Sequence, residues 1–177
     1  KVTPAKATFL IQLGSLLSND HNVTFVTRPS LVSLIQQISP HLSANIDTSL
    51  DNTHDIKDEL LLEECLEREK KYGENFALIM SHERGLGKGY IFNADLHPDL
   101  KRARLNHSQK LRNVLSQFKT YERIFAEIKP DVVVGMYIER VLSLVAKSNN
   151  VLDLSLVNAK FGDRYLWAEN GYTDNPG

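Results

Sequence analysis

The sequence is poor in sulfur and has no long apolar run. It contains one cysteine, Cys65, so an internal disulfide is excluded. The leucines around Cys65 indicate a buried thiol rather than a nucleophile. No apolar segment approaches the roughly 20 residues that a membrane-spanning helix needs, and no basic segment followed by an apolar one marks a signal peptide. We therefore expect a cytoplasmic protein.

The chain also lacks an excess of charge of either sign. Its 21 basic and 22 acidic residues leave a formal net charge of −1, so nothing in the overall charge indicates a nucleic acid partner. A length of 177 residues with 42% hydrophobic content is typical of a single globular domain with a sizeable core. We expect one domain over residues 1–177. Because the expected first strand is missing before Lys1, we also expect this domain to be part of a longer chain.

Helical and strand patterns alternate along the sequence. Short apolar strands of this kind are typical of parallel sheets covered on both faces. The pattern predicts a Rossmann-like, three-layer α/β domain with a mostly parallel sheet. Helices are expected over residues 4–18, 31–38, 55–71, 105–128 and 139–148, and parallel strands of one sheet over 23–27, 131–135 and 151–157.

Apolar residues predict a buried face on helices 4–18 and 105–128. The charged residues of two segments are of opposite sign. Phe9, Leu10, Leu13, Leu16 and Leu17 fall on one face of helix 4–18, and apolar residues between Leu111 and Ile128 form a stripe on helix 105–128. Helix 55–71 is acidic, whereas residues 101–123 are rich in Lys and Arg. The basic run fits an acidic substrate or peripheral contact with an anionic membrane. It equally fits a solvated face, or pairing with the acidic helix within the chain.

A glycine-rich segment follows residue 83. Glycines let backbone N–H groups approach an anion, and two flanking cations would add to the attraction. The segment is interpreted as a phosphate cradle or, alternatively, as a surface loop, because its spacing matches neither the P-loop nor the dinucleotide-binding fingerprint. Its candidate binding residues are Arg84, Gly85, Gly87 and Lys88.

Two further patterns contain histidine. His82 precedes Glu83, and a His–carboxylate pair can accept a proton from a sugar hydroxyl, although neighbours in sequence rarely point the same way. Asp95 and His97 have no third or fourth partner at a useful spacing, which favours a turn over a metal site. We therefore expect no metal and no cofactor.

The loops after the predicted strands are candidate sites because ligands of open α/β sheets bind at the carboxyl ends of the strands. Glu139 and Arg140 begin a helix there, where an arginine can pair with a phosphate or carboxylate. Each position also fits an ordinary connection, and a tryptophan fits the core as well as a sugar-stacking role. The candidates are Arg28, Tyr137, Glu139, Arg140, Arg164 and Trp167.

Several segments carry a resemblance to a known family. Residues 3–27 resemble the first helix and second strand of glycosyltransferases with the GT-B fold, and residues 128–134, with Pro130-Asp131, are similar to the entry of a later strand in those proteins. Residues 84–90 and 161–168 look like segments of bacterial surface or capsular polysaccharide biosynthesis proteins.

This resemblance implies the N-terminal, acceptor-side domain of an enzyme that moves a sugar from a nucleotide-sugar to a glycan acceptor. In that family the donor is bound mainly by a C-terminal domain, no metal is obligatory, and the base usually comes from a loop after the first strand. That loop would lie before Lys1, so Glu139 and His82 are the candidate bases here. The alternatives are a non-catalytic binding or assembly domain of a polysaccharide biosynthesis or export protein, and another kind of nucleotide-binding enzyme.

Overall fold

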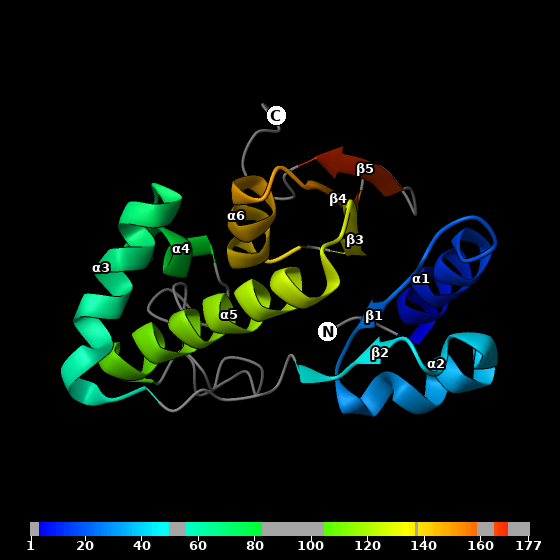
Figure 1. Ribbon diagram of the computed structural model, residues 1–177, viewed down its shortest axis with the longest axis horizontal. Coiled ribbons are helices and arrows are strands. Elements are labelled where there is room, and N and C mark those ends of the chain that lie inside the picture. Colours follow the sequence, from blue (N-terminus) through cyan, green and yellow to red (C-terminus); the bar gives the residue numbers. More distant parts are fainter. Residues whose placement is uncertain (1–3, 50–55, 83–104, 137, 159–164, 170–177) are drawn as a thin grey trace. The chain divides into compact units, whose positions relative to one another are not determined.

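The computed structural model describes residues 4–49, 56–82, 105–136, 138–158 and 165–169 (Figure 1). The chain divides into two compact units, Lys1–Asn52 (unit 1) and Thr53–Gly177 (unit 2). Both units contain helices and strands, so the predicted α/β class is confirmed. That the whole chain behaves as one domain stays a prediction.

Unit 1 is built around a very short parallel strand pair. Phe25 pairs with Ile46 and Val26 with Asp47, and the chain between the two strands is largely helical. Helix α1 packs against α2 within the unit. The elements in chain order are α1 (Pro4–Leu17), β1 (Phe25–Val26), the 3-10 helix η1 (Pro29–Leu31), α2 (Val32–Ile38), the 3-10 helix η2 (Pro40–Leu42) and β2 (Ile46–Asp47).

The buried face of α1 differs from the prediction. Leu16 is 69% exposed, and Phe9 and Leu17 are also exposed, whereas Ala7 and Ile11 are buried. The reason lies at Gly14, one further turn along the buried face. A Cβ atom there would lie 2.6 Å from Cζ of Phe25. At Gly14 the helix therefore approaches the Phe25 ring more closely than a residue with a side chain would allow.

Unit 2 joins a helical layer to a three-stranded sheet of order β3-β4-β5. Strand β3 is parallel to β4, and β5 is antiparallel to β4. Helix α6 contacts both β4 and α5. The elements are the 3-10 helix η4 (Asp58–Leu60), α3 (Leu61–Tyr72), α4 (Phe76–His82), α5 (His107–Ile128), β3 (Val132–Met136), α6 (Arg140–Ser148), β4 (Leu152–Asn158) and β5 (Tyr165–Glu169).

Helix α5 is the centre of the unit 2 core, and its predicted stripe is confirmed. It begins at Asn106, which forms a reciprocal capping box with Gln109, and it ends at Lys129 in the left-handed conformation. Leu115 and Phe118 on the stripe are completely buried. The ring of Phe118 stacks on Tyr72, with ring centroids 4.7 Å apart. None of the described helices is both long and apolar enough to cross a membrane.

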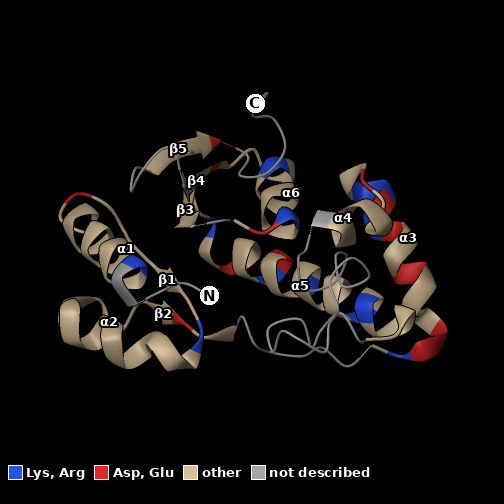
Figure 2. Cartoon of the chain, turned by 180° about the vertical axis from the view of Figure 1, so that it is seen from behind, with Lys and Arg blue, Asp and Glu red and all other residues tan. Residues whose placement is uncertain are grey.

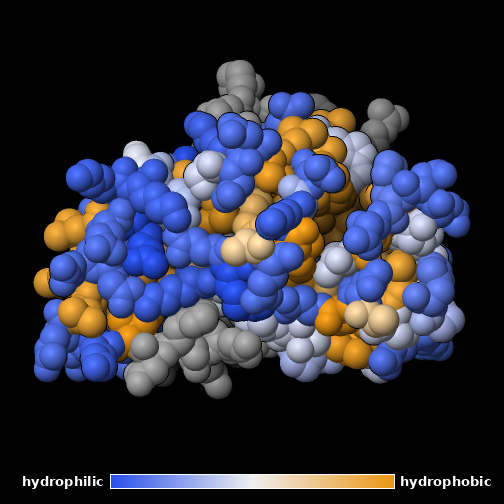
Figure 3. All heavy atoms as spheres, viewed as in Figure 1, coloured by the Kyte–Doolittle hydropathy of each residue, from blue (hydrophilic) through white to orange (hydrophobic). Residues whose placement is uncertain are grey.

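Charged residues join α3 and the preceding η4 to α5. Lys119 Nζ lies 2.7 Å from Glu64 Oε2, and Arg112 pairs with Asp58. Figure 2 shows acidic segments on α3 and basic segments on α5, and the surface over these two helices is mainly hydrophilic in Figure 3. For Arg112 and Lys119, the interpretation of the basic run as a partner of the acidic helix is confirmed. Residues 101–104 lie outside the described residues.

The predicted single parallel sheet is wrong. The parallel pairing of β3 with β4 is confirmed, but β1 pairs with β2 in a separate sheet, and β5, for which the sequence indicated no strand, adds an antiparallel edge. Apolar character identifies a strand but does not specify its partner. Among the described residues there are two small sheets instead of one mostly parallel sheet.

Candidate functional site

The register of the unit 2 sheet brings three chain segments to one edge. Met136 at the end of β3 is level with Leu156, which is level with Trp167, and Asn158 at the end of β4 pairs with Tyr165. The carboxyl ends of the two parallel strands therefore meet the first half of β5. Ligands of parallel α/β units bind at this edge. We take it as the candidate site.

Glu139 stands at this edge as the N-cap residue of α6. Its side chain makes no capping hydrogen bond, and its Oε2 instead accepts a hydrogen bond of 2.8 Å from the Tyr121 hydroxyl. Tyr121 is 7% exposed and belongs to α5, so the carboxylate is held by the core helix. The first turn of α6 adds a partial positive charge beside it. Glu139 is thus a partly exposed, oriented carboxylate, as a proton acceptor must be.

Ile138, the residue before Glu139, is tightly packed. The backbone N–H of Ile138 donates to Ser155 Oγ at 3.2 Å, and both residues are buried. A Cβ atom on Gly135 would lie 2.9 Å from Cγ1 of Ile138, so the strand needs a residue without a side chain there. This packing fixes the backbone that leads into Glu139.

Arg140 is held by a partner within the chain. Its Nε donates to Glu74 Oε1 at 2.8 Å and its Nη2 donates to Glu74 Oε2, which makes a two-point ion pair. The side chain of Arg140 is 17% exposed and that of Glu74 is 9% exposed. The predicted role of Arg140 as an anion receptor would require this pair to open. In the structure, Arg140 fastens the start of α6 to the segment between α3 and α4.

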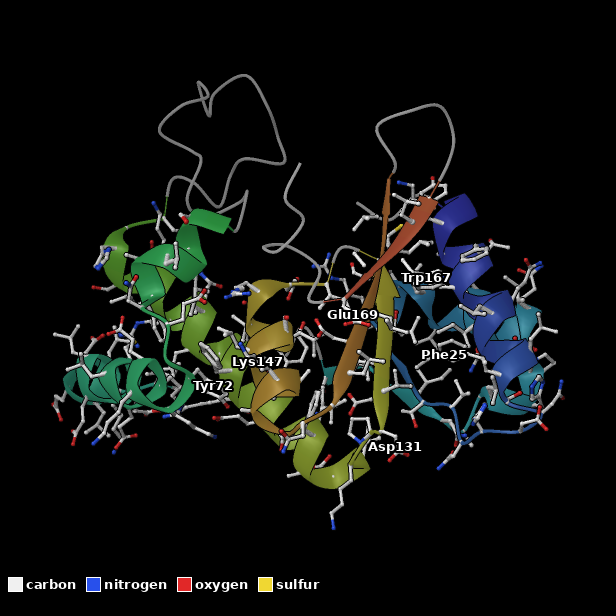
Figure 4. All side chains as sticks on the ribbon, turned by 90° about the horizontal axis from the view of Figure 1, so that it is seen from above. Phe25, Tyr72, Asp131, Lys147, Trp167 and Glu169 are labelled. Atoms are coloured by element: carbon white, nitrogen blue, oxygen red, sulfur yellow. The ribbon has the colours of Figure 1, made fainter. Side chains whose placement is uncertain are left out.

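The aromatic residues of β5 are exposed. Tyr165 is 43% exposed and Trp167 is 49% exposed, so the alternative interpretation of Trp167 as a core residue is wrong. Figure 4 shows Trp167 within β5 and Glu169 at its end. The opposite face of the sheet is covered by α6 and buries Asp153 and Ser155.

The other predicted site residues that the structure describes belong to other elements. Arg28 is exposed in unit 1 as the N-cap of η1, and His82 is the last residue of α4. The remaining predictions fall outside the described residues: Arg84, Gly85, Gly87, Lys88, Asp95, His97, Tyr137 and Arg164.

Sequence reasoning missed the two residues that hold Glu139 and Arg140. Tyr121 belonged to the predicted apolar stripe of α5, where its hydroxyl gave the only sign of a polar role. Glu74 follows Gly73, a left-handed helix end with φ of 70°, and nothing local links it to Arg140, 66 residues later.

A second polar cluster lies between α3 and α5. Glu122 accepts hydrogen bonds of 2.8 Å from both Lys71 and Tyr72, and it pairs with Arg68 at 3.2 Å. Burial acts to raise the pKa of Glu122, but these hydrogen bonds and the positive charges of Arg68 and Lys71 outweigh it, so the pKa is lowered. The cluster joins two helices and has the character of a structural network.

Among the described residues, neither the Cys65 thiol nor a cluster of metal-ligating side chains adds a further candidate site. Burial, followed by the negative charges of Glu69 and Glu64, raises the pKa of the Cys65 thiol to about 11, so the thiolate is scarce at neutral pH. Within the described ranges, no group of three His, Cys, Asp or Glu side chains could hold a metal ion. An open hollow lies at the N-terminal ends of α3 and α5, lined in part by Ile56, His107 and Arg112.

Comparison of the chain with family models, with curated proteins and with solved structures found no match in any of the three.

Proposed function

We propose that this chain is the acceptor-side part of a GT-B-type glycosyltransferase, with the Rossmann-like layering of that fold, and that Glu139 is its base. The observation that carries the proposal is the Glu139 carboxylate, oriented by Tyr121 at the carboxyl end of a parallel β-α-β unit. The resemblance of residues 3–27 and 128–134 to that family supports it. The exposed Trp167 beside the same edge supplies a surface suited to a sugar ring.

The chemistry needs one proton transfer and one displacement. The Glu139 carboxylate takes the proton of an acceptor hydroxyl while that oxygen forms a bond to the anomeric carbon of the donor sugar. The bond from the anomeric carbon to the nucleotide phosphate oxygen breaks, and the nucleotide leaves with the electron pair. A carboxylate fixed by a hydrogen bond at one oxygen keeps the other oxygen available for the proton.

Replacement of Glu139 tests this assignment. In the full-length protein, release of UDP, GDP or CMP from nucleotide-sugars would be followed with and without glycan acceptors. Glu139→Gln keeps the shape of the side chain and removes its basicity, so we expect the turnover number to fall by about 100-fold or more.

Glu127→Gln is the matched control, because Glu127 is an exposed carboxylate on α5 outside the candidate site. It should leave turnover unchanged. Circular dichroism must show both variants folded. Wild-type turnover in Glu139→Gln would exclude Glu139 as the base.

A second candidate is a non-catalytic binding or assembly domain of a polysaccharide biosynthesis or export protein. The observation that favours it is that Glu139 and Arg140 both have partners within the chain, Tyr121 and Glu74. Under this alternative, the full-length protein binds a glycan but releases no nucleotide from any donor, and Glu139→Gln leaves glycan binding intact.

A further inference from the structure

Three exposed side chains share one face of strand β5. Tyr165, Trp167 and Glu169 alternate along the strand with Leu166 and Ala168. Successive side chains of a strand point to opposite faces, so these three lie on one face at intervals of about 6.8 Å. All three are exposed, and β5 is the edge strand of the described sheet order. We call these three residues the β5 strip.

The chemistry of the strip is mixed. A docking face for an apolar helix is served by aliphatic side chains, which have no directional preference. The β5 strip itself presents two aromatic rings and then a carboxylate, and the same face of the sheet continues over the exposed aliphatic side chains of Val132, Val134 and Leu152. Aromatic rings pack against flat apolar surfaces, and a carboxylate accepts hydrogen bonds from hydroxyl groups. A pyranose ring has both features, an apolar C–H face and a rim of hydroxyl groups.

We propose that the β5 strip binds a glycan chain along its length, with sugar rings over Tyr165 and Trp167 and a sugar hydroxyl donating to Glu169. The assignment of this glycan as the acceptor rests on the proposed function, whereas glycan binding itself does not. Trp167 is level with Met136, and Met136 precedes Glu139 by three residues. With strands about 4.8 Å apart, the strip lies within a few sugar units of the Glu139 edge.

The chain offers its own reporter for this test, because Trp167 is the only tryptophan in the sequence. The 177-residue chain would be titrated, without any donor, with maltohexaose, cellohexaose, chitohexaose and a sialic acid hexamer, and with glucose as the monomer control. We expect a saturable change in tryptophan emission with at least one hexasaccharide and none with glucose at equal concentration. No response to any hexasaccharide overturns the proposal.

Variants locate the binding on the strip, with affinity measured by calorimetry. Trp167→Ala and Tyr165→Ala should each weaken binding about tenfold. Glu169→Gln should weaken it by roughly threefold, because the amide still offers one acceptor oxygen. Trp167→Phe keeps an aromatic ring and should retain most of the affinity.

Leu166→Ala is the matched control, since Leu166 is 56% exposed on the same strand but faces the other way. It should bind like the wild type. An equal loss in Leu166→Ala and Trp167→Ala would reject the strip. Light scattering adds a second check: if Trp167→Ala changes the oligomeric state and no glycan binds, the strip is a contact between copies, which also overturns the proposal.

Glu139→Gln separates the two proposals. If it binds the glycan normally but has lost turnover, both proposals stand. If it binds the glycan and turns over normally, the strip stands and Glu139 is not the base. If turnover depends on Glu139 while Trp167→Ala binds glycan like the wild type, the strip alone fails.

Discussion

The two units use the same parallel pairing of strands at very different lengths. In unit 1, two residues of β1 pair with two of β2, whereas in unit 2 five residues of β3 pair with β4, and β5 extends the sheet. Unit 2 also has more fully buried apolar side chains than unit 1. Among the described residues, Ile35 is the large apolar side chain of unit 1 that is no more than 2% exposed, whereas unit 2 has six that are completely buried: Ile79, Val114, Leu115, Phe118, Val141 and Val145.

This difference shows what a site at a strand end requires. A carboxylate can be held in one orientation only if the residues behind it are fixed, and in unit 2 the buried Tyr121 does this for Glu139. The corresponding residue after β1 is Arg28, which is exposed before a 3-10 helix. We therefore expect unit 2 to be the more stable unit and the one that contains the site.

The test with the largest expected effect removes a side chain at the centre of the unit 2 core. Phe118→Ala deletes a completely buried ring that stacks on Tyr72, so we expect the free energy of unfolding of unit 2 to fall by about 3–5 kcal/mol. Native-state hydrogen exchange should show reduced protection in α5, β3 and β4, with α1 unchanged. Equal loss of protection in α1 would mean that the units unfold together and that the comparison does not hold.

The next test concerns the buried ion pair at the start of α6. Arg140→Ala leaves the Glu74 carboxylate, 9% exposed, without its cation, and we expect a loss of roughly 3 kcal/mol in urea denaturation. Arg123→Ala breaks an exposed pair with Glu127 on α5 and should cost only about 0.3–0.5 kcal/mol. Similar losses in the two variants would show that the Arg140–Glu74 pair does not anchor α6.

A glycine tests the packing of unit 1. Gly14→Ala places a methyl group against the Phe25 ring, so we expect a loss of about 1–2 kcal/mol, although alanine favours a helix. The single variant Phe25→Leu and the double variant complete a mutant cycle. If the clash is the cause, Gly14→Ala is neutral or stabilising in the Phe25→Leu background. An unchanged loss in that background would place the cause elsewhere.

Local patterns predicted the elements well. Helices α5 and α6 and strands β3 and β4 lie within two residues of their expected bounds, because apolar periodicity and Pro130 mark them locally. The partner of each strand was not predicted. Phe25 and Val26 are as apolar as Val132 to Val134, and nothing in either run distinguishes a local pair from a place in a larger sheet.

Only part of the candidate site was predicted, because local patterns show where an element begins but not which elements pack against each other. Topology placed Glu139 and Arg140 after a parallel strand, and both do begin α6. Their partners, Tyr121 and Glu74, come from other elements and depend on how the helices pack. The exposure of Trp167 depends on β5, an edge strand that short-range pattern did not reveal.

The smallest predicted effect is on the pH dependence of stability, and it also distinguishes unit 2 from unit 1. The pKa of Glu122 is lowered in the folded protein, because hydrogen bonds from Lys71 and Tyr72 and nearby positive charges outweigh burial. Its contribution to stability is therefore complete above the ordinary glutamate pKa of about 4.3 and is lost as the pH falls through the lower folded value. We expect Glu122→Gln to cost on the order of 1 kcal/mol at pH 7 and almost nothing at about pH 2.

Urea denaturation of wild type and variant across this range measures the difference. Hydrogen exchange at low pH should show the loss in α3 and α5, which Glu122 joins, and no loss in α1. A constant difference between wild type and Glu122→Gln at all pH values would mean that the carboxylate acts through packing instead of charge.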